Sequence, residues 1–469
     1  MRNKILQEKL ILNFPFTPTK EQKQLIIKLS EYITIIDNKS LFLLKGYAGT
    51  GKTTIVASLV KSLPTLGKRS VLLAPTGKAA KVLSKYSKKS ASTIHKKIYW
   101  IRTNKKGNTY ITLKENTHIN TVFIIDEASM IPGNSNSEFT NRSLLDDLIE
   151  YVNNGVDCKL ILIGDTAQLP PVHLNISPAL DKSFLASQYN KEVITKELTQ
   201  VVRQKKNSEI LKNATALRNQ IAVEDFSFPK FKTNTDVMSI ETGEDLQDAL
   251  ETAYSQNGIY NTTVICRSNK RANLYNQQIR TKIRWQEESV STGDILMVVR
   301  NNYFWMEKEE DTDFIANGDN IEVIRILEYI KCYGFYFAKA NIKLIDTNNN
   351  IHLEVILLLD TLNSNNSSLT NKEYHKFYDE VCLDYKGEKD IKQKVKNNPF
   401  FNALYVKFAY AITCHKSQGG QWENVFIDLG YFNKDMLDKS YFRWLYTAIT
   451  RSTNKLYLIN FEKNFFNTE

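Results

Sequence analysis

The segment Gly46-Tyr47-Ala48-Gly49-Thr50-Gly51-Lys52-Thr53 decides the class of fold, because it follows an apolar segment and precedes a helical pattern. Glycines at these spacings let backbone N–H groups curl around phosphates. The lysine reaches the β- and γ-phosphates, and the threonine hydroxyl is placed to hold Mg²⁺. The segment therefore predicts a nucleotide site between a strand and a helix.

Short segments that are apolar on both faces, and that alternate with helical patterns, predict parallel sheets covered by helices. The candidate strands of a first sheet are Leu41–Lys45, Val71–Ala74, Val122–Asp126 and Leu160–Gly164. A second set consists of Thr263–Cys266, Phe408–Thr413, Val425–Leu429 and Lys455–Ile459. The sequence thus predicts two α/β domains, with their chemistry at the carboxyl ends of the strands.

Two stretches interrupt this alternation. Residues 98–117 read as a β-hairpin that turns at Lys105–Asn108, inserted in the first sheet domain. Residues from about 288 to 400 are strand-like and aromatic, which predicts a small β-rich domain inserted in the second. Within it, Lys386–Lys396 mixes Lys with Glu, Asp and Gln, which is typical of a solvated helix face.

The composition limits the class of protein. The chain has 469 residues, of which 42% are hydrophobic, so it can bury sizeable cores. Its net charge of +11 favours polyanionic partners. The five cysteines are scattered without a Cys-x-x-Cys pair, which predicts reduced thiols and no zinc site. We find no apolar run of membrane-spanning length and no signal peptide, and so expect a cytoplasmic protein with no membrane partner.

Two further strand ends supply groups that a phosphate-binding loop lacks. Asp126 ends an apolar segment and could ligate Mg²⁺, while the adjacent Glu127 could polarise the attacking water. Gln168, in Gly164-Asp165-Thr-Ala-Gln168-Leu-Pro-Pro, could sense the γ-phosphate through water.

Together these motifs resemble superfamily 1 helicases, and most closely their RecD/Dda branch. Other segments follow in the order of that family: Gln22 of an adenine-reading Gln motif, Ala74–Ala80 of motif Ia, Ser92–His95 of motif Ib, Leu198–Gln204 of motif IV, Ala411–Gln421 of motif V and Tyr446–Arg451 of motif VI. The resemblance covers residues from about 17 to 460.

The resemblance implies two RecA-like parallel-sheet P-loop domains with two insertions, a β-hairpin in the first and an SH3-like β-rich domain in the second. The implied boundaries are 1–195 for the first domain, 96–119 for its hairpin, 196–287 with 401–469 for the second domain, and 288–400 for its insertion.

The implied cofactors are ATP and Mg²⁺. The resemblance implies that the catalytic residues are Lys52, Asp126, Glu127, Gln168, Arg203 and Arg451, with the two arginines as arginine fingers. It also implies that Thr53 and Asp126 hold the metal. The implied nucleotide-binding residues are Gln22, Gly46, Ala48, Gly49, Thr50, Gly51, Lys52, Thr53, Thr54 and Gly420.

The matched motifs also carry side chains suited to phosphate oxygens of DNA. These are Thr76, Lys78, Ser92, Thr93, His95, Thr413, His415, Lys416 and Ser417. Aromatic residues could stack on bases, and we consider Tyr99, Trp100 and Trp444 for this role. The hairpin resembles the pin that splits a duplex, with Tyr99, Trp100 and Tyr110 as stacking candidates; an ordinary packed hairpin is equally compatible with the sequence.

By resemblance we expect a monomeric ATP-dependent DNA helicase that translocates 5′ to 3′ on single-stranded DNA and opens a fork. Its cell would be bacterial or phage-infected, and its protein partners would act in replication or recombination. One alternative is a translocase subunit of a RecD-like exonuclease complex that unwinds only with a partner. An RNA-directed helicase, a small-molecule P-loop kinase and a non-catalytic DNA-binding scaffold are the others.

Overall fold

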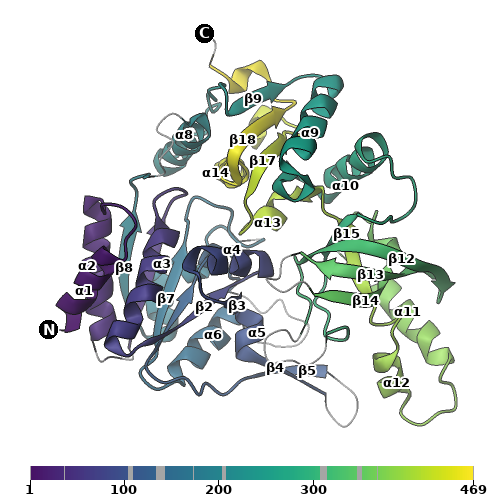
Figure 1. Cartoon of the computed structure of the whole chain (residues 1–469), viewed down its shortest axis with the longest axis horizontal. Helices are drawn as coiled ribbons and strands as arrows, with labels where there is room; N and C mark the ends of the chain where they lie inside the picture. The colour runs from purple at the N-terminus through teal and green to yellow at the C-terminus, as the bar shows by residue number, and fades with distance from the viewer. Residues whose placement is uncertain are drawn as a thin grey trace. The chain divides into compact units, whose positions relative to one another are not determined.

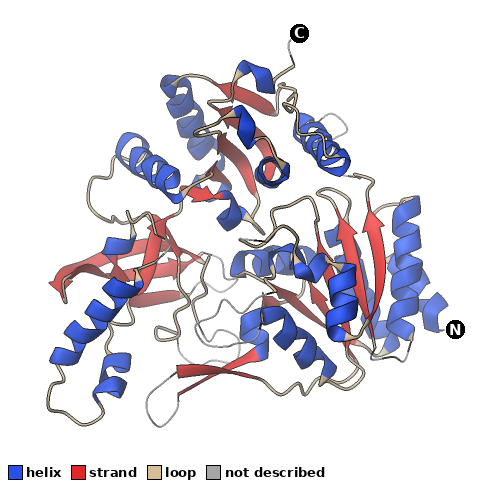
Figure 2. Cartoon of the chain, turned by 180° about the vertical axis from the view of Figure 1, so that it is seen from behind, coloured by secondary structure: helices blue, strands red, loops and turns tan. Residues whose placement is uncertain are grey.

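The computed structural model describes residues 2–35, 37, 39–103, 109–133, 143–172, 174–202, 208–306, 314–345, 351–366 and 368–467. By internal packing the chain divides into two compact units. Unit 1 consists of Met1–Arg102, Tyr110–Phe226 and Asp438–Thr450, and unit 2 of Thr103–Thr109, Ser227–Leu437 and Arg451–Glu469. Each unit is built around a parallel sheet (Figures 1 and 2).

Unit 1 contains a six-stranded, wholly parallel sheet in the order β3-β2-β6-β7-β1-β8. Its strands are β1 (Ser40–Gly46), β2 (Arg69–Ala74), β3 (Ala91–Thr93), β6 (Thr121–Ile125), β7 (Lys159–Gly164) and β8 (Glu192–Leu198). Its helices are α1 (Arg2–Leu12), α2 (Lys20–Thr34), α3 (Lys52–Ser62), α4 (Gly77–Ser87), α5 (Ile94–Ile98), α6 (Leu144–Asn153), α7 (Lys182–Tyr189), α8 (Glu209–Val223) and α14 (Lys439–Ile449). The four strands predicted for the first sheet are confirmed.

Alternation along β1 shows why this sheet is covered on both faces. Phe42 and Leu44 enter a core with α1, α2 and α3, whereas Leu41 and Leu43 enter a second core with α6 and α7. Successive side chains of a strand point to opposite faces, so an apolar residue at every position requires a helical layer on each side.

The predicted hairpin insertion is present as a two-stranded sheet of β4 (Tyr99–Thr103) and β5 (Thr109–Leu113) (Figure 1). It follows α5 directly. The turn predicted at Lys105–Asn108 lies outside the described residues.

Unit 2 contains a five-stranded sheet in the order β16-β10-β17-β18-β9, also parallel. Its strands are β9 (Val237–Ile240), β10 (Thr262–Cys266), β16 (Ala411–Thr413), β17 (Trp422–Asp428) and β18 (Ser452–Ile459), with helices α9 (Gly243–Asn257), α10 (Asn269–Gln278) and α13 (Cys414–Ser417). The single strand predicted at Phe408–Thr413 is wrong, because the chain bends at Tyr410 and passes from one sheet to another.

A closed barrel forms the insertion of unit 2, built from β11 (Ile295–Val298), β12 (Asn320–Cys332), β13 (Phe335–Leu344), β14 (His352–Leu358) and β15 (Leu404–Phe408). Two helices between its last strands, α11 (Asn371–Leu383) and α12 (Ile391–Asn397), pack on it through Phe377, Val381 and Val395. The barrel closes at Phe408, rather than at residue 400 as the sequence predicts.

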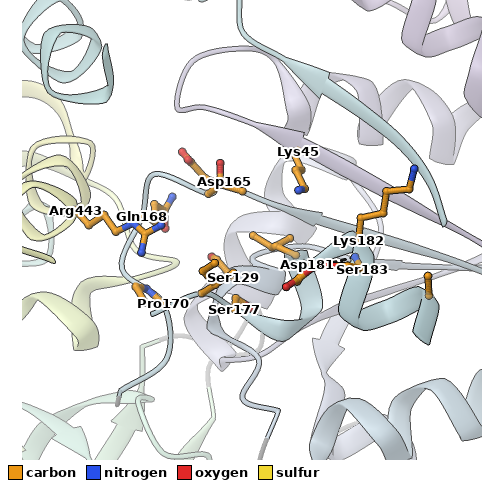
Figure 3. A pocket seen from close by; sticks show the side chains of 14 residues that line it. Lys45, Ser129, Asp165, Gln168, Pro170, Ser177, Asp181, Lys182, Ser183 and Arg443 are labelled. Atoms are coloured by element: carbon orange, nitrogen blue, oxygen red, sulfur yellow. Dashed lines mark hydrogen bonds between the residues drawn. The ribbon is translucent and has the colours of Figure 1, made fainter. Parts of the chain in front are cut away.

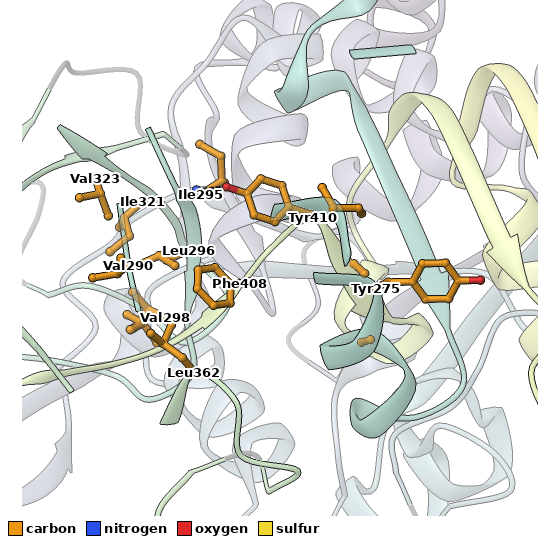
Figure 4. Close-up of a cluster of buried hydrophobic side chains, with 14 of the residues drawn as sticks. Tyr275, Val290, Ile295, Leu296, Val298, Ile321, Val323, Leu362, Phe408 and Tyr410 are labelled. Carbon is orange, nitrogen blue, oxygen red and sulfur yellow. Dashed lines mark hydrogen bonds between the residues drawn. The ribbon is translucent and has the colours of Figure 1, made fainter. Parts of the chain in front are cut away.

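One apolar core joins the barrel to the sheet of unit 2 (Figure 4). Leu296, Val298 and Phe408 line it from the barrel, and Val264 and Tyr275 from the sheet domain. At the bend between β15 and β16, the Tyr410 hydroxyl donates to Asp294 Oδ1 at 2.7 Å and accepts from Ile295 N–H at 3.2 Å. These bonds hold the bend, together with those of the Asn276 amide to residues 408 and 411.

The fold class predicted from the sequence is confirmed: two RecA-like parallel-sheet domains, a hairpin insertion and a β-rich insertion. The domain boundaries stay a prediction; by packing, α8 and α14 belong with unit 1. None of the described helices is both long and apolar enough to cross a membrane.

Candidate nucleotide and DNA sites

The loop between β1 and α3 has the backbone that its glycines predict. Gly49 and Gly51 adopt positive φ values of 78° and 87°, which an L side chain rarely tolerates. A Cβ added to Gly51 would lie 2.7 Å from Gln22 Nε2, so a side chain here would displace the Gln22 amide from its bond to Thr50 O. The loop can therefore turn its N–H groups inward as an anion cradle.

Lys52 begins α3 and lies in this loop. Its Nζ donates to the carbonyl oxygens of Gly46 at 2.5 Å and Tyr47 at 2.9 Å. The Thr50 hydroxyl also donates to Tyr47 O, at 2.8 Å. Thr53 and Thr54 follow in the first turn of α3, both partly exposed. The ammonium group is thus at the loop, where the sequence predicts it.

Gln22 supports the loop. Its Nε2 donates to Thr50 O at 3.1 Å, and its Oε1 accepts from Thr19 N–H at 3.0 Å in the capping box of α2. The side chain is buried. Both ends of its amide therefore bond to the protein, and a role in reading adenine stays a prediction.

Asp126 follows β6 and Glu127 adopts the left-handed conformation, with φ of 53°. The Glu127 N–H donates to Asp126 Oδ1 at 2.9 Å. Burial raises the pKa of Asp126, while this hydrogen bond and the charge of Lys52 act in the opposite direction. The carboxylate and the ammonium group thus influence each other at one edge of the sheet, which is suited to a nucleotide with its metal.

Gln168 lines a pocket of about 620 Å³ beyond the end of β7 (Figure 3). Figure 3 shows Gln168 and Arg443 at one side of it and Lys182 and Ser183 at the other. Lys45 also lines it and has the same orientation along β1 as Leu41 and Leu43, so the pocket is on the face opposite α3. Gln168 Oε1 is buried and accepts no hydrogen bond from the described residues.

Helix α14 brings two hydroxyls to these motifs. Tyr446 Oη accepts from Ala48 N–H at 2.9 Å and donates to Asp165 Oδ2 at 2.8 Å. Thr447 Oγ1 accepts from Leu169 N–H at 2.9 Å. Tyr446 lies in motif VI without a role predicted from the sequence; a tyrosine five residues before the motif's arginine is the signal that could have indicated one.

In unit 2, Arg451 is 4% exposed, and its Nη1 donates to Gly420 O at 3.3 Å. This bond brings together two residues predicted for the nucleotide site, one from motif V and one from motif VI. The other predicted arginine finger, Arg203, lies outside the described residues.

Several predicted DNA contacts in unit 1 serve as helix caps. The Thr76 hydroxyl accepts from Ala79 N–H and the Thr93 hydroxyl from Lys96 N–H, each at 3.2 Å. The remaining predicted residues are near the starts of the same helices, α4 and α5: Lys78, Ser92 and His95. Burial lowers the pKa of His95, which favours its neutral form. Helix N-termini of this kind favour phosphate, although capping occupies the two threonine oxygens.

In unit 2, Thr413, His415 and Lys416 are partly or fully exposed at the end of β16, and Lys416 Nζ donates to Asn317 Oδ1 at 2.8 Å. Ser417 is buried and donates to Cys414 O at 2.7 Å, so the structure does not support its predicted contact with DNA. Lys407, in β15, donates from its Nζ to Ser364 O, and burial together with the charge of Lys416 lowers its pKa to about 8.

Of the aromatic candidates, only Trp100 is exposed among those whose side chains are described, at 50%, with Lys114 Nζ 4.3 Å from its ring centre. The Tyr99 hydroxyl donates to Asp147 Oδ2 at 2.7 Å and the Tyr99 ring packs on the core that contains α6, while Trp444 is buried, so in this structure both side chains serve packing. The side chain of Tyr110 lies outside the described set.

Comparisons with known proteins agree with these motifs. The model of an AAA domain matches residues 19–230, and that of a UvrD-like helicase C-terminal domain matches residues 408–459. The chain is 28% identical to the ATP-dependent DNA helicase dda of Enterobacteria phage T4, covering 65% of this chain and 66% of that protein. It is 24% identical to the RecD subunit of the RecBCD enzyme of Buchnera aphidicola, covering 98% of this chain and 76% of that one.

Among solved structures, a chain from a structure of two coordinating Pif1 helicases on forked duplex DNA matches 97% of this chain and 95% of its own length. Its TM-score is 0.51 at 16% identity, which shows a shared fold. The AAA-domain model and the helicase C-terminal model together match more than half of the chain, and with these relatives they show that it belongs to the superfamily 1 DNA helicases, in the branch of RecD, Dda and Pif1.

Proposed function

We propose that this protein uses ATP, with Mg²⁺, to translocate 5′ to 3′ along single-stranded DNA and to unwind the duplex ahead of it. The observation that carries the proposal is the loop from Gly46 to Thr53, which holds Lys52 at its carbonyl oxygens, together with the partly buried Asp126 after β6, whose pKa the charge of Lys52 acts to lower. This pair suits a triphosphate and a divalent cation.

Thr53 and Asp126 are the residues that would hold the metal, since a hydroxyl and a carboxylate are oxygen ligands that Mg²⁺ prefers. A bound Mg²⁺ would neutralise charge on the phosphates. Glu127 is then placed next to Asp126 to orient the attacking water, and Gln168, whose Oε1 accepts no bond from the described residues, is suited to sense the γ-phosphate.

Single-stranded DNA is the proposed track. Two observations support a polyanionic partner. The chain has a net charge of +11, and His415 is exposed next to the partly exposed Lys416. The 5′ to 3′ direction is supported by resemblance to the RecD/Dda branch. Action at forks, a monomeric state and protein partners in replication or recombination also form part of the proposal.

The test measures ATPase rate with and without single-stranded DNA, and unwinding of duplexes that carry a 5′ or a 3′ tail. We expect DNA to stimulate the ATPase, and only the 5′-tailed duplex to open. Unwinding from the 3′ tail would refute the direction. Stimulation without unwinding would indicate a RecD-like subunit that needs a partner, and stimulation by RNA alone would indicate an RNA-directed helicase.

The variant Trp100→Ala tests whether the hairpin separates strands. We expect unwinding to slow by about tenfold, since stacking on one base contributes roughly 1–3 kcal/mol. The ATPase rate with single-stranded DNA should stay within twofold of the unmodified protein. Trp285→Ala removes another exposed tryptophan, 81% exposed in unit 2, and is the matched control. An equal loss of both activities in Trp100→Ala would contradict a pin.

A further inference from the structure

The P-loop of unit 1 is bonded to acceptors of the protein itself. Ala48 N–H, one of the loop donors, is bound by the hydroxyl of Tyr446, a residue of α14. Lys52 Nζ is bound by two carbonyl oxygens of the loop. Phosphate oxygens carry charge, so they bond such donors more strongly than a phenol or carbonyl oxygen does.

The Tyr446 hydroxyl is fixed from its other side as well. It donates to Asp165 Oδ2, while Asp165 Oδ1 accepts from Ala167 N–H at 2.9 Å. Tyr446 is 1% exposed. Burial and the Asp165 carboxylate raise its pKa well above the usual range, so the phenol keeps the proton that it donates. Its oxygen is therefore held with a lone pair directed at the loop.

The position of this contact indicates which phosphate it concerns. Asp165 directly follows β7 and precedes Gln168, the proposed sensor of the γ-phosphate, by three residues. Through Asp165, Tyr446 is linked to the segment that carries this proposed sensor, and on that basis its bond to Ala48 N–H is assigned to the side of the third phosphate. ADP, which lacks that phosphate, would leave the contact in place.

We propose that the Tyr446 hydroxyl is an internal ligand of the P-loop, which the γ-phosphate of ATP displaces from Ala48 N–H. This rests on the proposed nucleotide site. When the γ-phosphate takes the donor, α14 keeps its bonds from Thr447 to Leu169 N–H, from Tyr446 to Asp165 and from Arg443 to Asn175 O, and loses the bond from Tyr446 to the P-loop. Tyr446 is then a positioning residue that makes the attachment of α14 depend on which nucleotide is bound.

The variant Tyr446→Phe removes the competing oxygen and keeps the ring. Full-length protein would be titrated with fluorescently labelled AMP-PNP and ADP. We expect AMP-PNP to bind about twofold to tenfold more tightly in the variant, the factor that one net hydrogen bond supplies, with ADP affinity changed by less than twofold.

Tyr32→Phe is the matched control. The Tyr32 hydroxyl is also buried in unit 1 and also bridges two polar groups, since it donates to Leu160 O at 2.8 Å and accepts from Leu160 N–H at 3.0 Å. Its loss should lower stability without changing the ratio of the two affinities.

An unchanged ratio in Tyr446→Phe, or weaker binding of AMP-PNP relative to ADP, would overturn the displacement. A purely structural role of Tyr446 would change both affinities together and overturn it equally. If the unmodified protein bound neither nucleotide, the proposed function would fall as well, so the two failures are distinguishable.

Discussion

The variant Lys52→Ala is expected to lose at least a hundredfold in ATPase rate. Lys52 starts α3, and its Nζ already lies within hydrogen-bond distance of the loop carbonyls of Gly46 and Tyr47. In hydrolysis the same ammonium group would stabilise charge that develops on the β- and γ-phosphates. Removing one such preorganised donor typically costs about 10²–10³ in rate. A coupled phosphate-release assay with saturating single-stranded DNA measures the effect.

Lys61→Ala is the control for this variant, because Lys61 is exposed in the last turn of the same helix. It should retain the rate of the unmodified protein. Thermal unfolding should show both variants folded, since alanine is favourable in a helix. A Lys52→Ala protein with more than a tenth of the normal rate would remove the nucleotide site from the proposal.

Arg451→Ala is expected to keep ATP binding within a few-fold and to lose turnover by about 10³ or more, the scale of an arginine finger. The guanidinium group is buried and donates to the Gly420 carbonyl, which fixes its direction within unit 2. Single-turnover hydrolysis, together with titration of labelled nucleotide, separates the two effects.

Two further variants decide between catalysis and packing at Arg451. Arg451→Lys keeps the charge and loses the planar fork, so it should stay slow while it folds normally. Arg325→Ala removes an exposed arginine of β12 and should change neither turnover nor nucleotide binding. Loss of nucleotide binding or of folded protein in both Arg451 variants would show a structural role instead.

The sequence was sufficient to predict an element of the fold wherever a local pattern is compatible with one structure alone. A strand with apolar residues at every position, such as β1, can only be buried on both faces, and both parallel sheets were predictable on that basis. The P-loop was equally predictable, because Gly51 satisfies a requirement of backbone and of space at once.

Contacts between distant segments were not predictable in this way. The apolar run Phe408–Thr413 looks like one strand, and its division is seen only in distant contacts, the bonds of Tyr410 to residues 294 and 295 and of Asn276 to residues 408 and 411. Gln22 fits a nucleotide-reading motif, yet its amide is bonded to Thr19 and Thr50. The hydrogen bond of Tyr446 to Ala48 spans almost 400 residues, for which no local pattern gives a signal.

The division of unit 1 along the chain has a consequence for biosynthesis. Most of this unit lies before Phe226, but α14 is translated after the whole of the barrel. On the ribosome, the first sheet can assemble early, since its six strands all precede residue 199. The P-loop acquires the hydroxyl of Tyr446 only after both the barrel and α14 have been made. Nascent chains that stop before α14 would carry a P-loop that lacks this hydrogen bond.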